Sequence, residues 1–306
     1  MSNIAIVFPG QGAQKVGMAQ DFVLGHPECK SIFDAASKAI DIDMETLCFT
    51  ENEQLNQTEF TQPAILTAEI AMLEVVKTKL PAPAKTFAGH SLGEYTALVA
   101  AGVIPFTDAL KIVRRRGALM QDAVPLGKGA MAALISDNIE ALGYREIVEK
   151  SGAEVANFNS LGQVVISGPR EGVEKACADS KTAFPSMSII PLKVSAPFHC
   201  SMMRGIEKEF ESYLRSFESH FNTSLATTVL SNFSGTFHTK DTLVHNLVRQ
   251  ISGGVRWVEN MRAIAGVSNL IVEVGPARVL SKFFGSIEVT AKAVTDLRSM
   301  QKNLVA

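Results

Sequence analysis

A serine stands in the segment Gly-His-Ser-Leu-Gly at residues 89–93, where it could act as a nucleophile. A strand-like run at 86–89 precedes it and a helical pattern follows, which is the context that the motif Gly-x-Ser-x-Gly requires. Glycines allow the sharp turn that exposes the Ser91 hydroxyl, and the backbone N–H of Leu92 would favour negative charge beside it. We therefore predict that Ser91 is a nucleophile, with a chance match in a glycine turn as the alternative.

A serine hydroxyl needs a base to take its proton, and six histidines compete for that role. His199 is favoured because it follows a strand-like run and the break at 195–197, where a loop would leave the sheet edge. A solvated loop histidine is the alternative. His90 adjoins Ser91, so its side chain should diverge from the hydroxyl. The other histidines stand in polar or helical-surface contexts and are interpreted as solvated: His26, His220, His238 and His245.

The position of His199 in the chain limits the choice of fold. A simple α/β-hydrolase is disfavoured, because its histidine follows an acid and lies near the C-terminus. The group that orients His199 could be an acid or a backbone carbonyl.

The loop at residues 9–14, Pro-Gly-Gln-Gly-Ala-Gln, resembles a dinucleotide-binding fingerprint at first sight. That interpretation fails because Lys15 stands at the third glycine position and no suitably placed acid follows. The loop instead offers backbone N–H groups, and Gln11 could supply a second donor to an oxyanion. A purely structural glycine turn is the alternative.

The composition narrows the class of protein. Lys and Arg total 29 against 31 Asp and Glu, so no excess of positive charge indicates a nucleic acid or an anionic membrane as partner. The four cysteines lack the spacing of a metal site or a redox pair, which favours a reducing cytoplasm. No basic leader and no apolar run of about 18 residues is present, so we expect neither secretion nor membrane insertion.

Alternating strands and helices must position these residues. Strand patterns at 4–8, 86–89, 228–232 and 270–274 alternate with helical patterns at 63–80, 91–101, 106–122, 204–217 and 255–265. This alternation predicts an α/β fold with a mostly parallel sheet and helices on both faces.

The middle of the chain has a different order. Strand patterns at 131–135, 154–159, 163–167 and 187–194, with helical patterns at 139–150 and 170–181, follow the ferredoxin-like order β-α-β-β-α-β. We therefore expect a catalytic domain formed by residues 1–125 and 198–306, and an inserted small domain at 126–197.

Several motifs together are similar to one known family. They are Phe-Pro-Gly-Gln-Gly at 8–12, Gly-His-Ser-Leu-Gly-Glu at 89–94, Arg-Gly at 116–117, Asn-Phe-Asn-Ser at 157–160, Phe-His at 198–199 and Val-Glu-Val-Gly-Pro at 272–276. In this order and spacing they resemble the malonyl-CoA:acyl-carrier-protein transacylases over the whole chain. The resemblance implies an α/β-hydrolase-like large domain with a ferredoxin-like small domain.

The resemblance also implies roles for individual residues. Ser91 is acylated and His199 is its base. The backbone N–H groups of Gln11 and Leu92 form the oxyanion hole, and the backbone carbonyl of Gln250 orients the histidine.

Arg116 matches the carboxylate-binding arginine of the family. A guanidinium in a desolvated pocket would pair with the free carboxylate of a malonyl group, whereas an acetyl group would leave it unpaired. We therefore expect Arg116 to separate malonyl from acetyl donors. The neighbouring Arg114 and Arg115 are interpreted as a solvated basic face rather than as contacts to a carrier protein or CoA.

Phe198 and His90 are the other expected substrate-binding residues. The ring of Phe198 would crowd a methyl branch at C2 of the acyl group, so we expect a moderate preference for malonyl over methylmalonyl donors. Simple packing is the alternative. Two positions depart from the family: Gly254 and Leu161 stand where proline is common, which puts the rigidity of Gln250 in doubt.

The function implied is transfer of malonyl from CoA to the phosphopantetheine thiol of an acyl carrier protein, through a malonyl-serine intermediate. It would serve fatty acid or polyketide synthesis, by a monomer with no permanently bound cofactor and no metal. An acyl hydrolase of the same fold and a non-catalytic docking protein are the alternatives.

Overall fold

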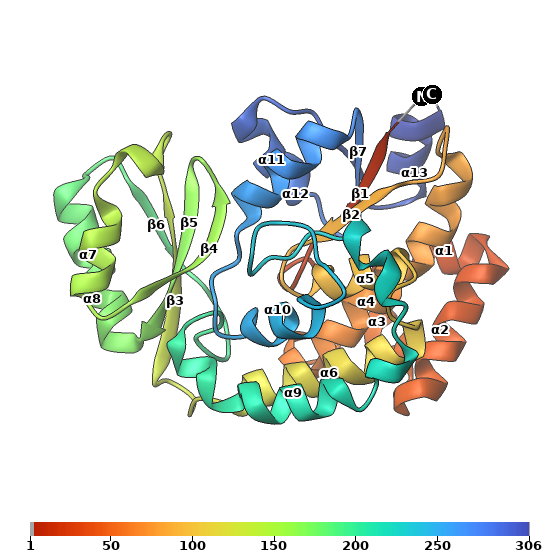
Figure 1. The fold of residues 1–306 in the computed structure, drawn as a ribbon, viewed down its shortest axis with the longest axis horizontal. Coiled ribbons are helices and arrows are strands. Elements are labelled where there is room, and N and C mark those ends of the chain that lie inside the picture. The colour runs from red at the N-terminus through yellow and green to blue at the C-terminus, as the bar shows by residue number, and fades with distance from the viewer. Residues whose placement is uncertain (1–2, 306) are drawn as a thin grey trace.

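The computed structural model describes residues 3–305 and contains two separate sheets (Figure 1). The first sheet has the order β2-β1-β7-β8, and every neighbouring pair is parallel. Its strands are β1 (Ile4–Phe8), β2 (Thr86–Gly89), β7 (Leu270–Val274) and β8 (Lys292–Val294). The prediction of a parallel sheet in an α/β fold is therefore confirmed.

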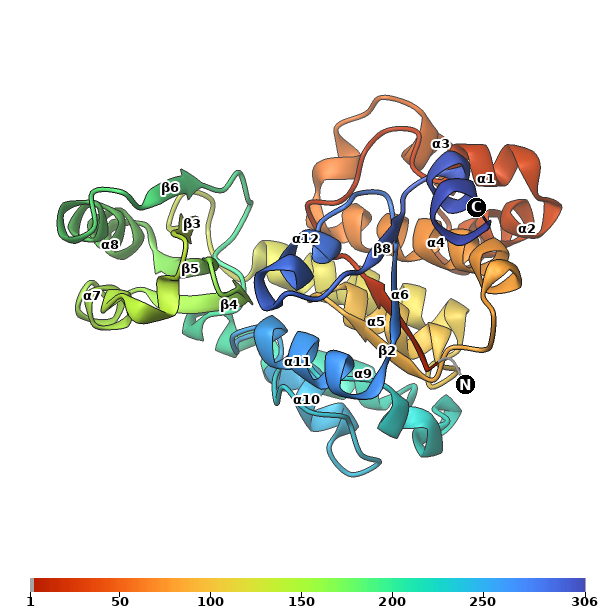
Figure 2. The same cartoon turned by 90° about the horizontal axis from the view of Figure 1, so that it is seen from above.

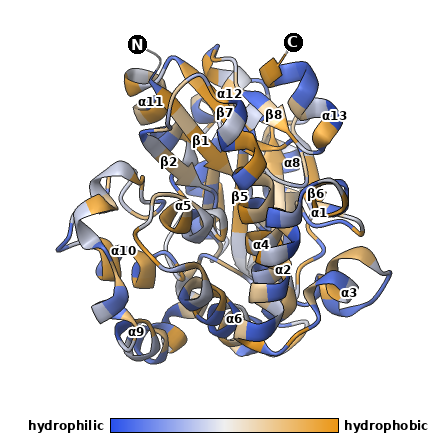
Figure 3. Ribbon diagram, turned by 90° about the vertical axis from the view of Figure 1, so that its right-hand side faces the viewer, coloured by the Kyte–Doolittle hydropathy of each residue, from blue (hydrophilic) through white to orange (hydrophobic). Residues whose placement is uncertain are grey.

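Alternate residues of β1 face two different cores. Ile6 and Phe8 pack into the larger core, whereas Ala5 and Val7 pack against α11 and α12 on the opposite face. A strand buried on both faces needs an unbroken apolar run, which is why β1 reads Ile-Ala-Ile-Val-Phe. Figure 3 shows this strand as hydrophobic and shows outer helices, such as α2, with residues of both kinds.

Helices cover both faces of the parallel sheet. They are α1 (Gln20–Gly25), α2 (Pro27–Ile40), α3 (Met44–Phe49), α4 (Thr58–Val76), α5 (Gly93–Ala100), α6 (Phe106–Asp122), α9 (Glu207–Arg215), α10 (Leu243–Arg249), α11 (Trp257–Val267), α12 (Leu280–Phe284) and α13 (Leu297–Met300). None of the helices in residues 3–305 is both long enough and apolar enough to cross a bilayer.

The second sheet is antiparallel and lies beside the first, as the two views in Figures 1 and 2 show. Its order is β4-β5-β3-β6. Its elements are β3 (Gly129–Ile135), α7 (Tyr144–Lys150), β4 (Glu154–Ser160), β5 (Gln163–Pro169), α8 (Arg170–Ala183) and β6 (Ser188–Pro191). The predicted order β-α-β-β-α-β is confirmed, and α7 and α8 pack on one face of this sheet.

Several predicted elements are wrong in kind or extent. The helix expected at 139–150 is a 3₁₀ turn, Ile139–Ala141, followed by the shorter α7, and the strand expected at 187–194 is only β6, Ser188–Pro191. No strand forms at 228–232: Thr228 ends a 3₁₀ segment, Thr223–Thr228, and Val229 and Leu230 form only isolated bridges. A turn at Gly235 (φ 72°) sends the chain back after these two residues, so no ladder forms. The helix expected at 204–217 is a 3₁₀ segment, Ser201–Ile206, that leads into the shorter α9.

Candidate active site

Ser91 lies on the turn between β2 and α5, in a left-handed backbone conformation (φ 52°). A Cβ atom on Gly89 would lie 2.0 Å from the carbonyl of Gly93, and a Cβ on Gly93 would lie 2.2 Å from the carbonyl oxygen of Phe8. The sharp turn therefore depends on both glycines. This is the strand–turn–helix context that the sequence predicted.

The imidazole of His199, which follows Ser91 by 108 residues in the chain, lies next to the Ser91 hydroxyl. Its Nε2 lies 2.7 Å from Ser91 Oγ, and its Nδ1 lies 2.7 Å from the backbone oxygen of Gln250. Because a carbonyl oxygen only accepts, Nδ1 must carry the proton and Nε2 is left free to accept one from Ser91. Among the candidates for the orienting group, the structure places a backbone carbonyl there.

The environment keeps His199 neutral. The residue is 5% exposed. Burial, and after it the positive charge of Arg116, lowers the pKa of His199 from 6.5 to about 3. A neutral imidazole whose Nε2 carries no proton is the form that can act as a base.

Arg116 lies on α6 with its guanidinium directed at the same hydroxyl. Its Nη2 donates to Ser91 Oγ at 3.1 Å and to Gln250 Oε1 at 2.8 Å, and its Nη1 donates to Gln62 Oε1 at 2.9 Å. It is 1% exposed, and within residues 3–305 no carboxylate forms an ion pair with it. Burial lowers the pKa of Arg116, whereas the nearby Tyr95 and Glu94 raise it. A buried cation whose partners are all neutral is suited to an anionic ligand.

A cavity of about 640 Å³ opens in front of Ser91. Its lining includes Ser91, Arg116 and His199, together with Gln11, His90, Leu92 and Phe198. A Cβ on Gly10 would lie 2.3 Å from the backbone oxygen of His90, so the Gln11 loop packs directly on the nucleophile turn. Gln11 and Leu92, whose backbone N–H groups are the expected oxyanion donors, therefore both line the cavity.

His90 points away from the hydroxyl, as its position predicted. The Asn159 amide nitrogen donates to Gln163 Oε1, so the amide oxygen of Asn159 faces His90. Since that oxygen only accepts, His90 Nε2 donates to it, at 2.8 Å. Burial lowers the pKa of His90. Phe198 is 7% exposed and lines the cavity.

Several residues of the site were missed by sequence reasoning. Asn232 holds the nucleophile turn from both sides: its Oδ1 accepts from Ser91 N at 2.6 Å, and its Nδ2 donates to Gly89 O at 2.8 Å. Glu94 is fully buried beneath the turn. Of these residues, only Glu94 could have been picked out from the sequence, because it ends the motif at 89–94.

One interpretation of the histidines is wrong. His238 is not solvated but 0% exposed, with Nε2 2.7 Å from Glu94 Oε1.

The basic face expected at Arg114 and Arg115 is engaged in ion pairs, because Arg114 Nε lies 3.1 Å from Glu59 and Arg115 contacts Glu209.

The two departures from the family pattern have different surroundings. A Cβ on Gly254 would lie 2.9 Å from the backbone oxygen of Val155, so a side chain there would press on β4. Leu161 N donates to Ser286 Oγ at 3.3 Å, a bond that proline could not make. Gln250 itself is 1% exposed and bonded through both its backbone and its side chain.

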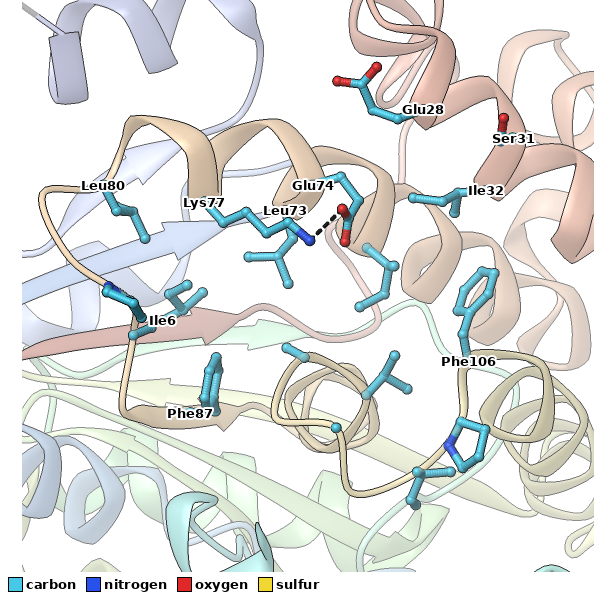
Figure 4. A pocket seen from close by; sticks show the side chains of 18 of the residues that line it. Ile6, Glu28, Ser31, Ile32, Leu73, Glu74, Lys77, Leu80, Phe87 and Phe106 are labelled. Atoms are coloured by element: carbon cyan, nitrogen blue, oxygen red, sulfur yellow. Dashed lines mark ion pairs between the residues drawn. The ribbon is translucent and has the colours of Figure 1, made fainter. Parts of the chain in front are cut away.

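A larger cavity of about 770 Å³ lies elsewhere (Figure 4). Ile6 and Phe87 line it from β1 and β2, and an ion pair between Lys77 and Glu74 lies beside it. It lacks Ser91 and the polar groups that converge there. Size alone therefore does not identify the reactive site.

The chain matches proteins of known family. A model of the acyl transferase domain matches residues 5–284. The malonyl CoA-acyl carrier protein transacylase of Haemophilus influenzae is 40% identical over 312 residues, which cover 100% of this chain and 97% of that protein.

Solved structures agree with this match. An acyl carrier protein S-malonyltransferase from Vibrio cholerae superposes with a TM-score of 0.91 at 38% identity, over 98% of this chain and 99% of that one. A malonyl-transacylase solved in complex with its type II PKS acyl-carrier protein gives a TM-score of 0.91 at 36% identity, over 99% of both chains. With its fold and the geometry around Ser91, the chain belongs to the malonyl-CoA:acyl-carrier-protein transacylases of the acyl transferase family.

Proposed function

We propose that this enzyme transfers a malonyl group from CoA to the phosphopantetheine thiol of an acyl carrier protein, through a malonyl ester on Ser91. The observation that carries the proposal is the convergence of a neutral base and a buried cation on one hydroxyl. His199 Nε2 lies 2.7 Å and Arg116 Nη2 lies 3.1 Å from Ser91 Oγ. The product would serve fatty acid or polyketide synthesis.

The first half-reaction loads the serine. His199 Nε2 takes the Ser91 proton as Oγ attacks the thioester carbonyl, and the carbonyl oxygen becomes an oxyanion. The backbone N–H groups of Gln11 and Leu92 are suited to stabilise it. When the C–S bond breaks, the protonated His199 gives its proton to the CoA sulfur and CoA leaves.

The second half-reaction reverses these steps with another thiol. The phosphopantetheine thiol gives its proton to His199 as its sulfur attacks the malonyl ester. The C–O bond to Ser91 then breaks, and Oγ regains the proton from the histidine. Arg116 holds the free malonyl carboxylate throughout, because its guanidinium can form a bidentate pair with it.

Isotope-labelled malonyl-CoA tests the proposal. The wild-type enzyme should form one covalent adduct at Ser91, detected by peptide mass spectrometry, and Ser91→Ala should form none. Ser180→Ala is the matched control, because Ser180 is buried with no partner for its hydroxyl in the described chain. Absence of label from the wild type, under conditions that label a relative, would reject the proposal.

The alternative of an acyl hydrolase is tested by the fate of the acyl group. A hydrolase of neutral acyl chains has no use for a buried cation, so Arg116 argues against it. We expect transfer to a carrier thiol to exceed hydrolysis for the malonyl donor. Faster hydrolysis than transfer, in the presence of a competent carrier, would favour the hydrolase.

The remaining features of the enzyme are also proposals. We propose a small domain at residues 126–197, which includes the whole antiparallel sheet from Gly129 to Pro191, and a catalytic domain formed by 1–125 and 198–306. We also propose a cytoplasmic monomer without a bound cofactor or metal, and without nucleic acid or membrane as partner. Free thiols at Cys29, Cys48, Cys177 and Cys200 fit a reducing compartment.

A further inference from the structure

Glu94 is buried beneath the nucleophile turn, and no step of the proposed chemistry uses it. It lies in the first turn of α5 and is 0% exposed. Its Oε2 accepts hydrogen bonds from Gln250 Nε2 at 2.7 Å and from the backbone N–H of Asn232 at 2.9 Å. Its Oε1 lies 2.7 Å from His238 Nε2. Three partners on one carboxylate hold it in a single position.

The side-chain amide of Gln250 connects Glu94 with Arg116. Gln250 Nε2 donates to Glu94 Oε2 at 2.7 Å and to the backbone oxygen of Ser91 at 3.0 Å, and Gln250 Oε1 accepts from Arg116 Nη2 at 2.8 Å. An amide can present either end to a neighbour, so its other partners decide which end faces Arg116. An ionised carboxylate only accepts, so it draws the NH₂ group toward Glu94. The carbonyl end is then left for the guanidinium, which only donates.

The direction of Arg116 depends on this arrangement. Apart from the Ser91 hydroxyl, its hydrogen-bond partners are the amide oxygens of Gln62 and Gln250, and its Nε has no acceptor in the described residues. α5, which carries Glu94, packs on α6, which carries Arg116, and no ion pair joins the two side chains within residues 3–305. If the Gln250 amide turned over, two donor groups would face each other and the guanidinium would move.

We propose that Glu94 is a positioning residue that fixes the Gln250 amide, so that Arg116 presents its guanidinium to the carboxylate of the acyl group. This inference rests on the proposed function, in which Arg116 binds that carboxylate. Glu94 would thus act on the choice of acyl group rather than on the reactivity of Ser91. The rival explanation is that Glu94 only supports the nucleophile turn through Asn232.

Glu94→Gln separates the two explanations. The substitution keeps an oxygen for the Asn232 N–H and for Gln250 Nε2, which share Glu94 Oε2, but removes the charge that strengthens the bond to Gln250. We expect the ratio of kcat/KM for malonyl-CoA to that for acetyl-CoA to fall roughly 10-fold, as a charge-assisted hydrogen bond becomes a neutral one. This fall should come from a higher KM for malonyl-CoA rather than from a lower kcat. Labelling of Ser91 by a neutral sulfonyl fluoride, which needs no carboxylate anchor, should change less than about twofold.

A double-mutant cycle tests whether Glu94 acts through Gln250. Gln250→Met removes the amide but keeps the backbone carbonyl that bonds to His199. In that background, Glu94→Gln should cause no further fall in the malonyl-to-acetyl ratio. Glu69→Gln is the matched control, because Glu69 is also 0% exposed and accepts a hydrogen bond from Thr96 instead. It should leave the ratio unchanged.

Three results would overturn the inference. They are an unchanged ratio in Glu94→Gln, an equal loss for malonyl-CoA and the sulfonyl fluoride, and a full effect of Glu94→Gln in the Gln250→Met background. Arg116→Ala separates this failure from failure of the proposed function. If Arg116→Ala lowers the ratio and Glu94→Gln does not, only the inference fails; if Arg116→Ala leaves the ratio unchanged, the proposed function fails.

A folding defect in Glu94→Gln would not prevent a decision, because Gln250→Met tests the same connection. It should lower the malonyl-to-acetyl ratio by a larger factor than it slows labelling of Ser91 by the sulfonyl fluoride, a reaction affected only by loss of the Gln250 Nε2 bond to the Ser91 backbone oxygen. An equal fall in the malonyl-to-acetyl ratio and in the rate of Ser91 labelling would reject a positioning role. Thermal unfolding of each variant identifies those that are folded at the assay temperature.

Discussion

At the scale of single residues, the most unusual property of the site is a histidine that stays neutral while bonded on both sides. His199 is surrounded by protein and lies near the cation of Arg116, and both effects disfavour a second positive charge. The Gln250 carbonyl fixes the tautomer without adding a negative charge. An acid in that place would instead raise the pKa of the base.

This environment predicts a pH dependence of stability. His199 has a pKa of about 3 when folded and near 6.5 when unfolded, so between these values the unfolded chain binds the extra proton. Stability is therefore complete above about pH 6.5 and falls as the pH drops toward 3. Melting temperatures from pH 7 to pH 4 should fall more for the wild type than for His199→Asn.

The exposed His245 provides the control for this experiment. His245→Asn should retain the pH dependence of the wild type. Identical pH profiles for the wild type and His199→Asn would contradict a depressed pKa at His199. In the active enzyme, the acid limb of kcat/KM should lie below the ordinary pKa of histidine.

Phe198 predicts a second effect at this scale. Replacing it with alanine should make room for a methyl branch at C2, so the kcat/KM ratio of methylmalonyl-CoA to malonyl-CoA should rise roughly 10-fold or more. Side-by-side assays with both donors measure it. Phe184→Ala, at a half-buried residue that packs against the small sheet's core, should leave the ratio unchanged. An unchanged ratio in Phe198→Ala would mean that the ring only packs.

At the scale of elements, the turn from β2 to α5 is the part of the site where backbone atoms pack most closely. Gly89 and Gly93 touch across the turn, and Asn232 bonds to the backbone on both sides of His90. The position of the Ser91 hydroxyl is therefore set by backbone contacts that involve no reacting group.

Gly89→Ala should be strongly destabilising for this reason. Its Cβ would lie 2.0 Å from backbone atoms of Gly93, so we expect a loss of about 3 kcal/mol or more in the free energy of unfolding. Gly266→Ala in α11 is the control, because a Cβ there meets nothing within 4 Å. Urea unfolding measures both. Equal stability of the two variants would show that the turn can relax.

The sequence allowed the turn, the parallel sheet and the small sheet's order to be predicted, because each depends on local patterns. The helix α6 was predicted at its observed bounds, 106–122, since its apolar spacing is regular. The strand expected at 228–232 was wrong because its apolar residues are buried without a neighbouring ladder. Asn232 and His238 could not be assigned, because their roles depend on partners more than 100 residues away.

At the scale of the whole molecule, Ser91 and His199, the proposed nucleophile and base, lie where the two sheets are joined. β4 of the small sheet bonds to the segment after Gln250, since Phe158 N donates to Val255 O at 2.9 Å and Val255 N donates to Ala156 O at 2.8 Å. Glu154 at the start of β4 also accepts from the backbone of Ser201, two residues after His199, at 3.0 Å. The small sheet therefore supports the base as well as lining the cavity.

Removal of this support should affect stability and activity together. Glu154→Ala leaves the Ser201 N–H without its charged acceptor, so we expect a loss of about 1–3 kcal/mol in unfolding free energy and a lower kcat. Glu146→Ala is the control, because its side chain is 73% exposed and, within residues 3–305, its one ion pair is with Lys150 in α7. If Glu154→Ala matched that control in both measurements, the connection would be dispensable.

The backbone of the reactive pair has a consequence for laboratory evolution. Ser91 (φ 52°) and His199 (φ 57°) both adopt a conformation that costs roughly 1–2 kcal/mol for a residue with a side chain. A library screened for heat resistance alone should therefore accumulate glycine at position 91, where the side chain is small and its loss leaves little empty space. Such survivors would be folded and inert, so any thermostability campaign on this enzyme needs a turnover screen in every round.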